Sequence, residues 1–168
     1  MFGIVLLLVG SGLVNNGYCI KHEIDLKSAS VVNFFTATIL FIANLTFMIR
    51  DGLYLNAGLG MMFAFTYYYI GVIDLFKLDL RPFGVYSLGV SISLLPWLLI
   101  LAQEADWWMF ALGVVWFAIF FLLWVEDTLG KLSSKKSKRF IAHFYYFSGV
   151  FSGWVPGLLI LTDKWPPI

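Results

Sequence analysis

Charged residues are scarce in this 168-residue sequence: Asp, Glu, Lys and Arg together make up only 12% of it, against about a quarter in soluble domains. Hydrophobic residues make up 61%, more than the usual half or so. This composition indicates a membrane protein that lies in a lipid bilayer and has little chain left for a soluble domain. The formal net charge of +1 provides no basic field, so nucleic acid is not an expected partner.

Cysteine is almost absent. Cys19 is the single cysteine, which excludes an intrachain disulfide and a cysteine-built metal site. The first residues, MFGIVLLLVG, have neither a basic segment nor a small-residue cleavage pattern. We therefore interpret them as a retained first span and not as a signal peptide.

Long uncharged runs dominate what remains. A helix needs roughly 20 apolar residues to cross a bilayer, and six runs approach that length. The predicted spans are 1–20, 30–49, 57–73, 84–102, 107–125 and 140–162. Because most connectors are short, neighbouring spans should be antiparallel and adjacent. We expect an all-α membrane protein with a single six-helix domain over residues 1–168.

The basic residues are distributed unevenly among the connectors. Nine of them fall in the first, third and fifth connectors, against two, Arg50 and Lys164, on the other side. Since basic loops stay in the cytoplasm, both termini should be outside and Cys19 should lie at the cytoplasmic end of span one. The segments IDLKS and LDLRP also resemble each other. They hint at three helix hairpins on one plan, or they merely reflect charges that suit helix ends.

The predicted spans contain no Asp, Glu, Lys or Arg, and only His143 approaches one, near its cytoplasmic end. Proton relays, ion-coupled carriers and intramembrane metalloproteases need such groups. A serine protease would need a base beside its serine, and no mid-membrane histidine is present. We therefore expect no enzyme, no metal and no cofactor.

The interior instead holds aromatic rings and weakly polar groups. An uncharged passage rejects ions, whose desolvation it does not compensate, yet can pass a small neutral polar solute. Each group also has a structural interpretation. Asparagines such as Asn33 and Asn44 more often form hydrogen bonds between helices than line a solute path. Trp107 and Trp108 suit the interfacial belt, whereas Trp116 lies deeper and is either core packing or pore wall.

Bulky residues recur at helical spacing on the odd-numbered spans. On span one, four residues at steps of four, three and four share one face: Phe2, Leu6, Val9 and Leu13. This stripe is either a packing seam or a pore lining. Phe63 and Tyr67 lie one turn apart on span three, as Leu112 and Trp116 do on span five, so each odd span can supply bulky groups to one shared axis.

Several blocks resemble the urea and amide channel family, the UreI and AmiS proteins. They are LLLVGSGLVNNG, IDLKSASVVNFF, FAFTYYY, LDLRPFGVYSL, DWW, LGK and WVPGLL. The resemblance covers nearly the whole chain. It implies a homohexamer in which each six-helix protomer encloses its own pore, built from three hairpins, with both termini outside.

The resemblance also implies which residues form the narrow part of the pore. They are Phe2, Leu6, Val9, Leu13, Phe63, Tyr67 and Trp116. Tyr67 would face the solute path, while Tyr68 and Tyr69, turned by about 100° per residue, would face other helices or the interface between subunits.

Two departures from the family pattern matter. Members associated with urea carry a Glu before a Gly in span six, and Ser148 takes that place here, which leaves the preference for urea over other amides open. Acid-gated members carry a long, histidine-bearing outer loop, whereas RDGLYLN and QEAD are short and lack histidine. Acid gating is therefore not expected.

Together these observations predict a passive, homo-oligomeric channel in the cytoplasmic membrane that conducts urea or short aliphatic amides into the cytoplasm. The alternative is a membrane scaffold or assembly subunit that transports nothing and whose polar interior only joins helices. The alignment of aromatic residues on the odd spans favours the channel.

Overall fold

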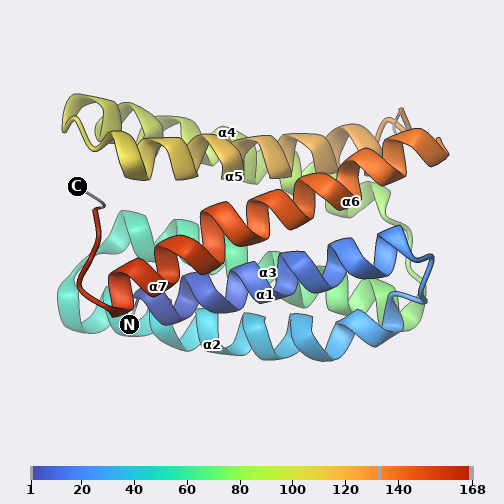
Figure 1. Ribbon diagram of the computed structural model, residues 1–168, viewed down its shortest axis with the longest axis horizontal. Helices are drawn as coiled ribbons and strands as arrows, with labels where there is room; N and C mark the ends of the chain where they lie inside the picture. The colour runs from blue at the N-terminus through green and yellow to red at the C-terminus, as the bar shows by residue number, and fades with distance from the viewer. Residues whose placement is uncertain (1, 132–133, 167–168) are drawn as a thin grey trace. The chain divides into compact units, whose positions relative to one another are not determined.

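The computed structural model describes residues 2–131 and 134–166, and these are almost entirely helical (Figure 1). The elements are α1 (Phe2–Lys21), α2 (Lys27–Asp51), α3 (Tyr54–Phe76), α4 (Arg81–Gln103), α5 (Trp107–Asp127), α6 (Lys135–Gly149), η1 (Val150–Trp154) and α7 (Val155–Leu161). The last three form one continuous helical run. Six helices of the described chain are long and apolar enough to cross a membrane.

The predicted all-α architecture with six spans is therefore confirmed, and most of the helices extend beyond the predicted limits at one end or both. The run predicted at 30–49 is the helix Lys27–Asp51, and that predicted at 57–73 is Tyr54–Phe76. The extra turns carry polar residues that a search for uncharged runs omits. One of them, Asp74, is only 6% exposed, so the buried surface of α3 does include a carboxyl group close to its end.

The helices form two compact units, α1–α3 with α6, η1 and α7 in one, and α4 with α5 in the other. In the first unit α2 packs along α3, and α1 packs along α6, η1 and α7 as well as α2. Consecutive helices therefore pair in α2–α3 and α4–α5, while α1 takes its main partner from the far end of the chain. The single domain expected from the sequence remains a prediction.

Glycine lines the contact between α1 and the α6–α7 run, which lie side by side in Figure 1. Gly3, Gly10 and Gly17 follow one another at intervals of seven along α1. A Cβ atom added to Gly10 would lie 2.8 Å from the backbone nitrogen of Trp154, and one added to Gly153 would lie 2.5 Å from the Cα atom of Gly10. The two backbones thus approach so closely that only glycine fits, as is common between membrane helices.

The wide turn η1 lies at this closest approach. Its residues, Val150–Trp154, form a π-helical turn within the sixth span, a feature often found at functional sites. The indole nitrogen of Trp154 donates a hydrogen bond to Ser11 Oγ over 3.0 Å. This hydrogen bond joins η1 to α1 beside the glycine contacts.

The helices α2 and α4 begin in the same way. Asp25 accepts a hydrogen bond from the backbone nitrogen of Lys27 (3.0 Å), and Asp79 accepts one from that of Arg81 (2.9 Å). The similarity between IDLKS and LDLRP thus corresponds to one contact used twice, in which an aspartate just before the helix accepts from its first amide, a group with no partner within the helix. The start of α6 is capped differently, by Ser134, whose hydroxyl accepts from the Ser137 nitrogen.

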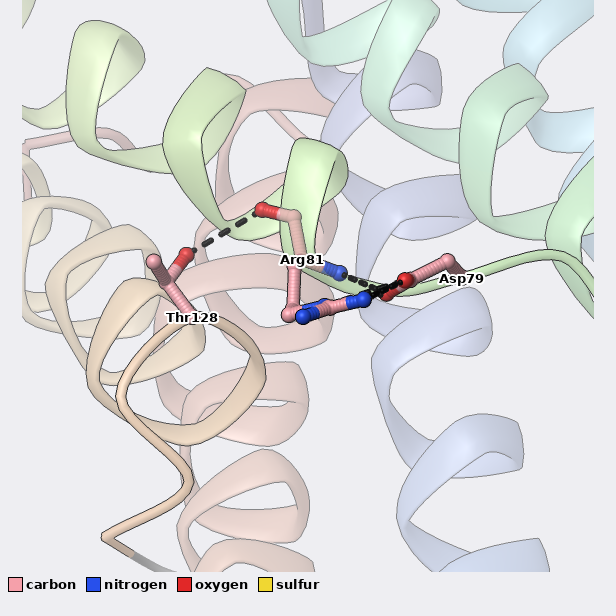
Figure 2. Close-up of polar contacts among 3 residues, drawn as sticks. All are labelled: Asp79, Arg81 and Thr128. Atoms are coloured by element: carbon pink, nitrogen blue, oxygen red, sulfur yellow. Dashed lines mark hydrogen bonds and ion pairs between the residues drawn. The ribbon is translucent and has the colours of Figure 1, made fainter.

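Figure 2 shows how the start of α4 is tied to the end of α5 within the second unit. The Arg81 guanidinium pairs with Asp79 (Nε–Oδ2, 2.9 Å), and the Thr128 hydroxyl donates to the Arg81 carbonyl over 3.2 Å. The hydrogen bonds from Arg81 lower the pKa of the Asp79 carboxyl to about 2. In the first unit, the ion pair with Lys77 (2.7 Å) likewise lowers the pKa of Asp25.

Candidate solute pathway

The predicted stripe on α1 lies between two packed faces of that helix. Leu6, Val9 and Leu13 are 2%, 7% and 7% exposed, and Phe2 is half-buried. The glycine face that meets the α6–α7 run lies to one side of the stripe. Gly12, which meets α3, lies to the other, at about 100° per residue. The stripe is therefore a buried apolar surface with packed neighbours on both sides, and its role as a pore wall stays a prediction.

The Tyr67 side chain of α3 reaches α1. Its ring lies against Gly12, where an added Cβ atom would be 2.7 Å from Tyr67 Cε1, and its hydroxyl donates to the Val9 carbonyl over 3.0 Å. The side chain is 7% exposed, and Phe63, one turn earlier, is half-buried. Tyr67 therefore contacts α1 near the middle of the stripe, and the Val9 carbonyl accepts its hydroxyl proton.

The other hydroxyls of FAFTYYY have different partners. Tyr68 shares a 2.8 Å hydrogen bond with Thr38 of α2, so its side chain lies toward another helix, as the sequence predicted. The Thr66 hydroxyl donates to the Met62 carbonyl one turn earlier in the same helix. The Tyr68 and Thr66 hydroxyls thus find partners within the protein, since lipid offers none.

Trp116 and Leu112 belong to the second unit, where both are buried at 7% and 8% exposure. The Trp116 ring stacks on Trp97 of α4, with 5.8 Å between ring centroids and 6° between planes. Gly113 allows this approach, because a Cβ atom there would lie 3.0 Å from Trp97 Cζ3. Trp97 was not among the residues predicted from the sequence, although a tryptophan immediately after Pro96 inside an apolar run was a visible signal.

Ser148 is completely buried, and within the described part of the chain its hydroxyl has no hydrogen-bond partner. The adjacent Gly149 packs on Leu13 and Val14, where an added Cβ atom would lie 3.2 Å from Leu13 Cβ. Ser152 donates to the Ser148 carbonyl over 2.7 Å. The structure thus places Ser148 on the α6 surface that packs against α1, and the stripe, Tyr67, Phe63 and Ser148 all belong to the first unit.

The buried asparagines divide into two kinds. Asn44 donates to the Leu40 carbonyl of its own helix over 2.7 Å. Asn33 of α2 accepts a hydrogen bond of 3.1 Å from Asn16 of α1, so it does join two helices. The single cysteine, Cys19, is 3% exposed. No group of three His, Cys, Asp or Glu side chains that could hold a metal is found in the described part of the chain.

Comparison with known proteins decides the family. The family model for AmiS/UreI family transporters matches residues 1–164. The chain belongs to this family. Because it is a family of transporters, the expectation that the chain is not an enzyme agrees with its membership.

The similar proteins include channels and transporters. An acid-activated urea channel of Helicobacter pylori is 28% identical over 199 residues, covering 98% of this chain and all of the relative. A protein of Mycolicibacterium smegmatis, provisionally named an amidate substrates transporter, is 26% identical over 172 residues, which is 98% of this chain and 78% of the relative.

A solved structure shows the same fold. The cryo-electron microscopy structure of the Helicobacter pylori urea channel in its closed state matches with a TM-score of 0.88 and 27% identity, over 98% of this chain and all of that one. These matches support a multi-pass membrane channel for urea or amides.

Proposed function

We propose that this protein is a passive channel that conducts urea and short aliphatic amides across the cytoplasmic membrane into the cytoplasm, without acid gating. The observation that carries the proposal is the match of almost the whole chain, in sequence and in fold, to transporters of this family. Relatives named for urea and for amidates support the solute class.

The distribution of charge supports passive conduction of neutral solutes. In the described helices, every Asp, Glu, Lys and Arg lies within five residues of a helix end. A proton or ion pathway needs ionisable groups or carbonyl filters at mid-depth. The stripe on α1 is apolar, and a flat neutral solute crosses such a surface at far lower desolvation cost than an ion.

We assign the path to the residues predicted from the sequence. In the first unit they are Phe2, Leu6, Val9, Leu13, Phe63, Tyr67 and Ser148, and in the second Leu112 and Trp116. The close join of Tyr67 to Val9 and Gly12 supports the first group. The stack of Trp116 on Trp97 gives the second group a flat, fixed aromatic surface.

The short outer connectors support the absence of acid gating. Two residues separate α2 from α3, and three separate α4 from α5. The alignment to the acid-activated channel extends over 199 positions, so at least 31 of them, the difference from 168, have no counterpart here. Neither connector carries a histidine, the side chain that ordinarily titrates between pH 5 and 8.

Solute flux into proteoliposomes tests this function. Vesicles with the purified protein should swell in urea or acetamide several-fold faster than protein-free vesicles, at every external pH from about 5 to 8 with internal pH clamped. Swelling no faster than in protein-free vesicles would favour the scaffold interpretation. A steep rise on acidification would contradict the absence of gating. We also propose a homohexamer, by resemblance, and native mass spectrometry should count six subunits.

A further inference from the structure

The pair formed by Asn16 and Asn33 has hydrogen-bonding capacity that the protein does not use. Asn16 Nδ2 donates to Asn33 Oδ1 over 3.1 Å, and the two residues are 6% and 0% exposed. Asn16 Oδ1 and Asn33 Nδ2 are both buried, and neither has a hydrogen-bond partner among the residues that the structure describes. One acceptor and one donor group therefore remain. Exchanging oxygen and nitrogen in both amides leaves the same surplus.

Buried polar atoms are nearly always satisfied, by protein or by ordered water, and a water molecule can fill this place when no solute is present. The partner here must donate to one atom and accept from the other. Urea and primary amides present both functions on one flat group, an N–H donor and a carbonyl acceptor. Asn44, buried on the same helix, differs because its amide nitrogen already donates to the Leu40 carbonyl.

Asn16 lies at the end of the apolar stripe on α1. The apolar stripe runs through positions 2, 6, 9 and 13, and a further step of three reaches Asn16, which keeps it within the same band of about 80°. Gly12, against which the Tyr67 ring lies, is one turn before Asn16. Asn16 is thus the first polar side chain on the stripe toward the Lys21 end of the helix.

We propose that the Asn16–Asn33 pair binds the amide group of the solute where the apolar stripe ends. Asn16 Oδ1 accepts from the solute N–H, and Asn33 Nδ2 donates to the solute carbonyl. This inference rests on the proposed function and adds a binding site to it. The site selects amides over solutes of similar size that lack an N–H, because such solutes leave the Asn16 oxygen unsatisfied.

Competition against tracer flux tests the site. In wild-type proteoliposomes, unlabelled acetamide should reduce the flux of radiolabelled urea more effectively than acetone does, which has a similar size and a carbonyl group but no N–H. In Asn16→Ala and Asn33→Ala, the acetamide concentration that halves urea flux should rise about tenfold. Asn44→Ala removes another buried asparagine from α2, the helix of Asn33. It should leave the half-inhibiting acetamide concentration within about twofold of the wild-type value.

The outcomes separate the site from the function. If wild-type vesicles conduct urea but acetamide competes equally in wild type, Asn33→Ala and Asn44→Ala, the binding site is refuted and the channel stands. If wild-type vesicles conduct no urea, the proposed function fails and the site falls with it.

A measurement on wild-type protein needs no variant to fold. The chain contains five asparagines, so side-chain amide signals from protein labelled with nitrogen-15 asparagine in nanodiscs can be resolved. The signals of Asn16 and Asn33 should shift as urea is added, while those of Asn44 and Asn56 stay constant. Equal shifts at all five asparagines, or none, would overturn the proposal.

Discussion

The contact between Gly10 and Gly153 gives the sharpest test of the packing. In Gly153→Ala the new Cβ atom would lie 2.5 Å from Gly10 Cα, 2.7 Å from Gly10 N and 3.0 Å from the Leu6 carbonyl oxygen. Carbon atoms pack at about 3.5 to 4.0 Å, so the helices must separate by roughly 1 Å. All three neighbours are backbone atoms, so no change of rotamer relieves the clash.

The expected cost follows from this geometry. Overpacking of this kind costs about 1–3 kcal/mol, whereas alanine in place of glycine inside a helix contributes about 0.5–1 kcal/mol of stability. Gly89→Ala is the matched control, since Gly89 is a helical glycine whose added Cβ would have no described atom within 4 Å apart from its chain neighbours and its own helix backbone. The two variants should therefore differ in unfolding free energy by about 1–3 kcal/mol, the overpacking term alone.

Thermal unfolding in detergent, followed by tryptophan fluorescence, measures the difference. Using about 2–4 °C per kcal/mol for a chain of this size, we expect Gly153→Ala to unfold several degrees below Gly89→Ala. Urea flux should also fall in Gly153→Ala, because separating α1 from the α6–α7 run displaces the stripe that includes Leu6. Equal midpoints for the two variants would refute the close approach of these helices.

Three further predictions concern the aromatic stack, the topology and the cap of α4. Trp97→Leu should remove the ring stacked on Trp116, losing about 0.5–1.5 kcal/mol beyond the lost buried area, and should change the near-ultraviolet dichroism of the packed indoles; unchanged dichroism would contradict the stack. In a cysteine-free background, Leu53→Cys should react with an impermeant maleimide in intact cells and His22→Cys should not; the reverse pattern would invert the topology. The Asp79 carboxyl, with its pKa lowered to about 2, should stay ionised from pH 8 to 4 in a carbon-13 titration. Its contribution to stability is present above the unfolded pKa near 3.9 and is lost only as the pH falls through about 2.

The choice of labelling sites follows from the structure. The native Cys19 would be a poor topology probe because it is 3% exposed, so burial alone would protect it on either side of the membrane. His22 and Leu53 are both exposed and lie at opposite ends of α2, in the first and second connectors. A difference in labelling between these two sites therefore reports the side of the membrane on which each lies, and not a difference in burial.

The six spans were predictable because a bilayer imposes a length and an apolar composition that are local properties of the sequence. The partners of each span were not. Nothing local indicates that α1 packs on the far end of the chain, and the spacing of Gly3, Gly10 and Gly17 acquires meaning only once their partners are known. Asp74 was missed because its helix continues past the apolar run.

The candidate site shows the same limit. Spacing placed Phe2, Leu6, Val9 and Leu13 on one face, but whether that face meets lipid, protein or solute depends on neighbours distant in sequence. The bond from Tyr67 to the Val9 carbonyl and the pairing of Asn16 with Asn33 join helices across the fold. Such bonds depend on tertiary packing, which a single sequence does not specify.

The central claim is that the protein passes neutral amides passively while excluding ions. Proteoliposomes with a series of protein-to-lipid ratios, with no proton or sodium gradient, test it when urea permeability and ionic conductance are recorded in the same preparation. We predict that urea permeability rises in proportion to protein content while proton and sodium conductance stay at the protein-free level. Urea permeability that does not depend on protein content, or that requires a proton gradient, would contradict the account.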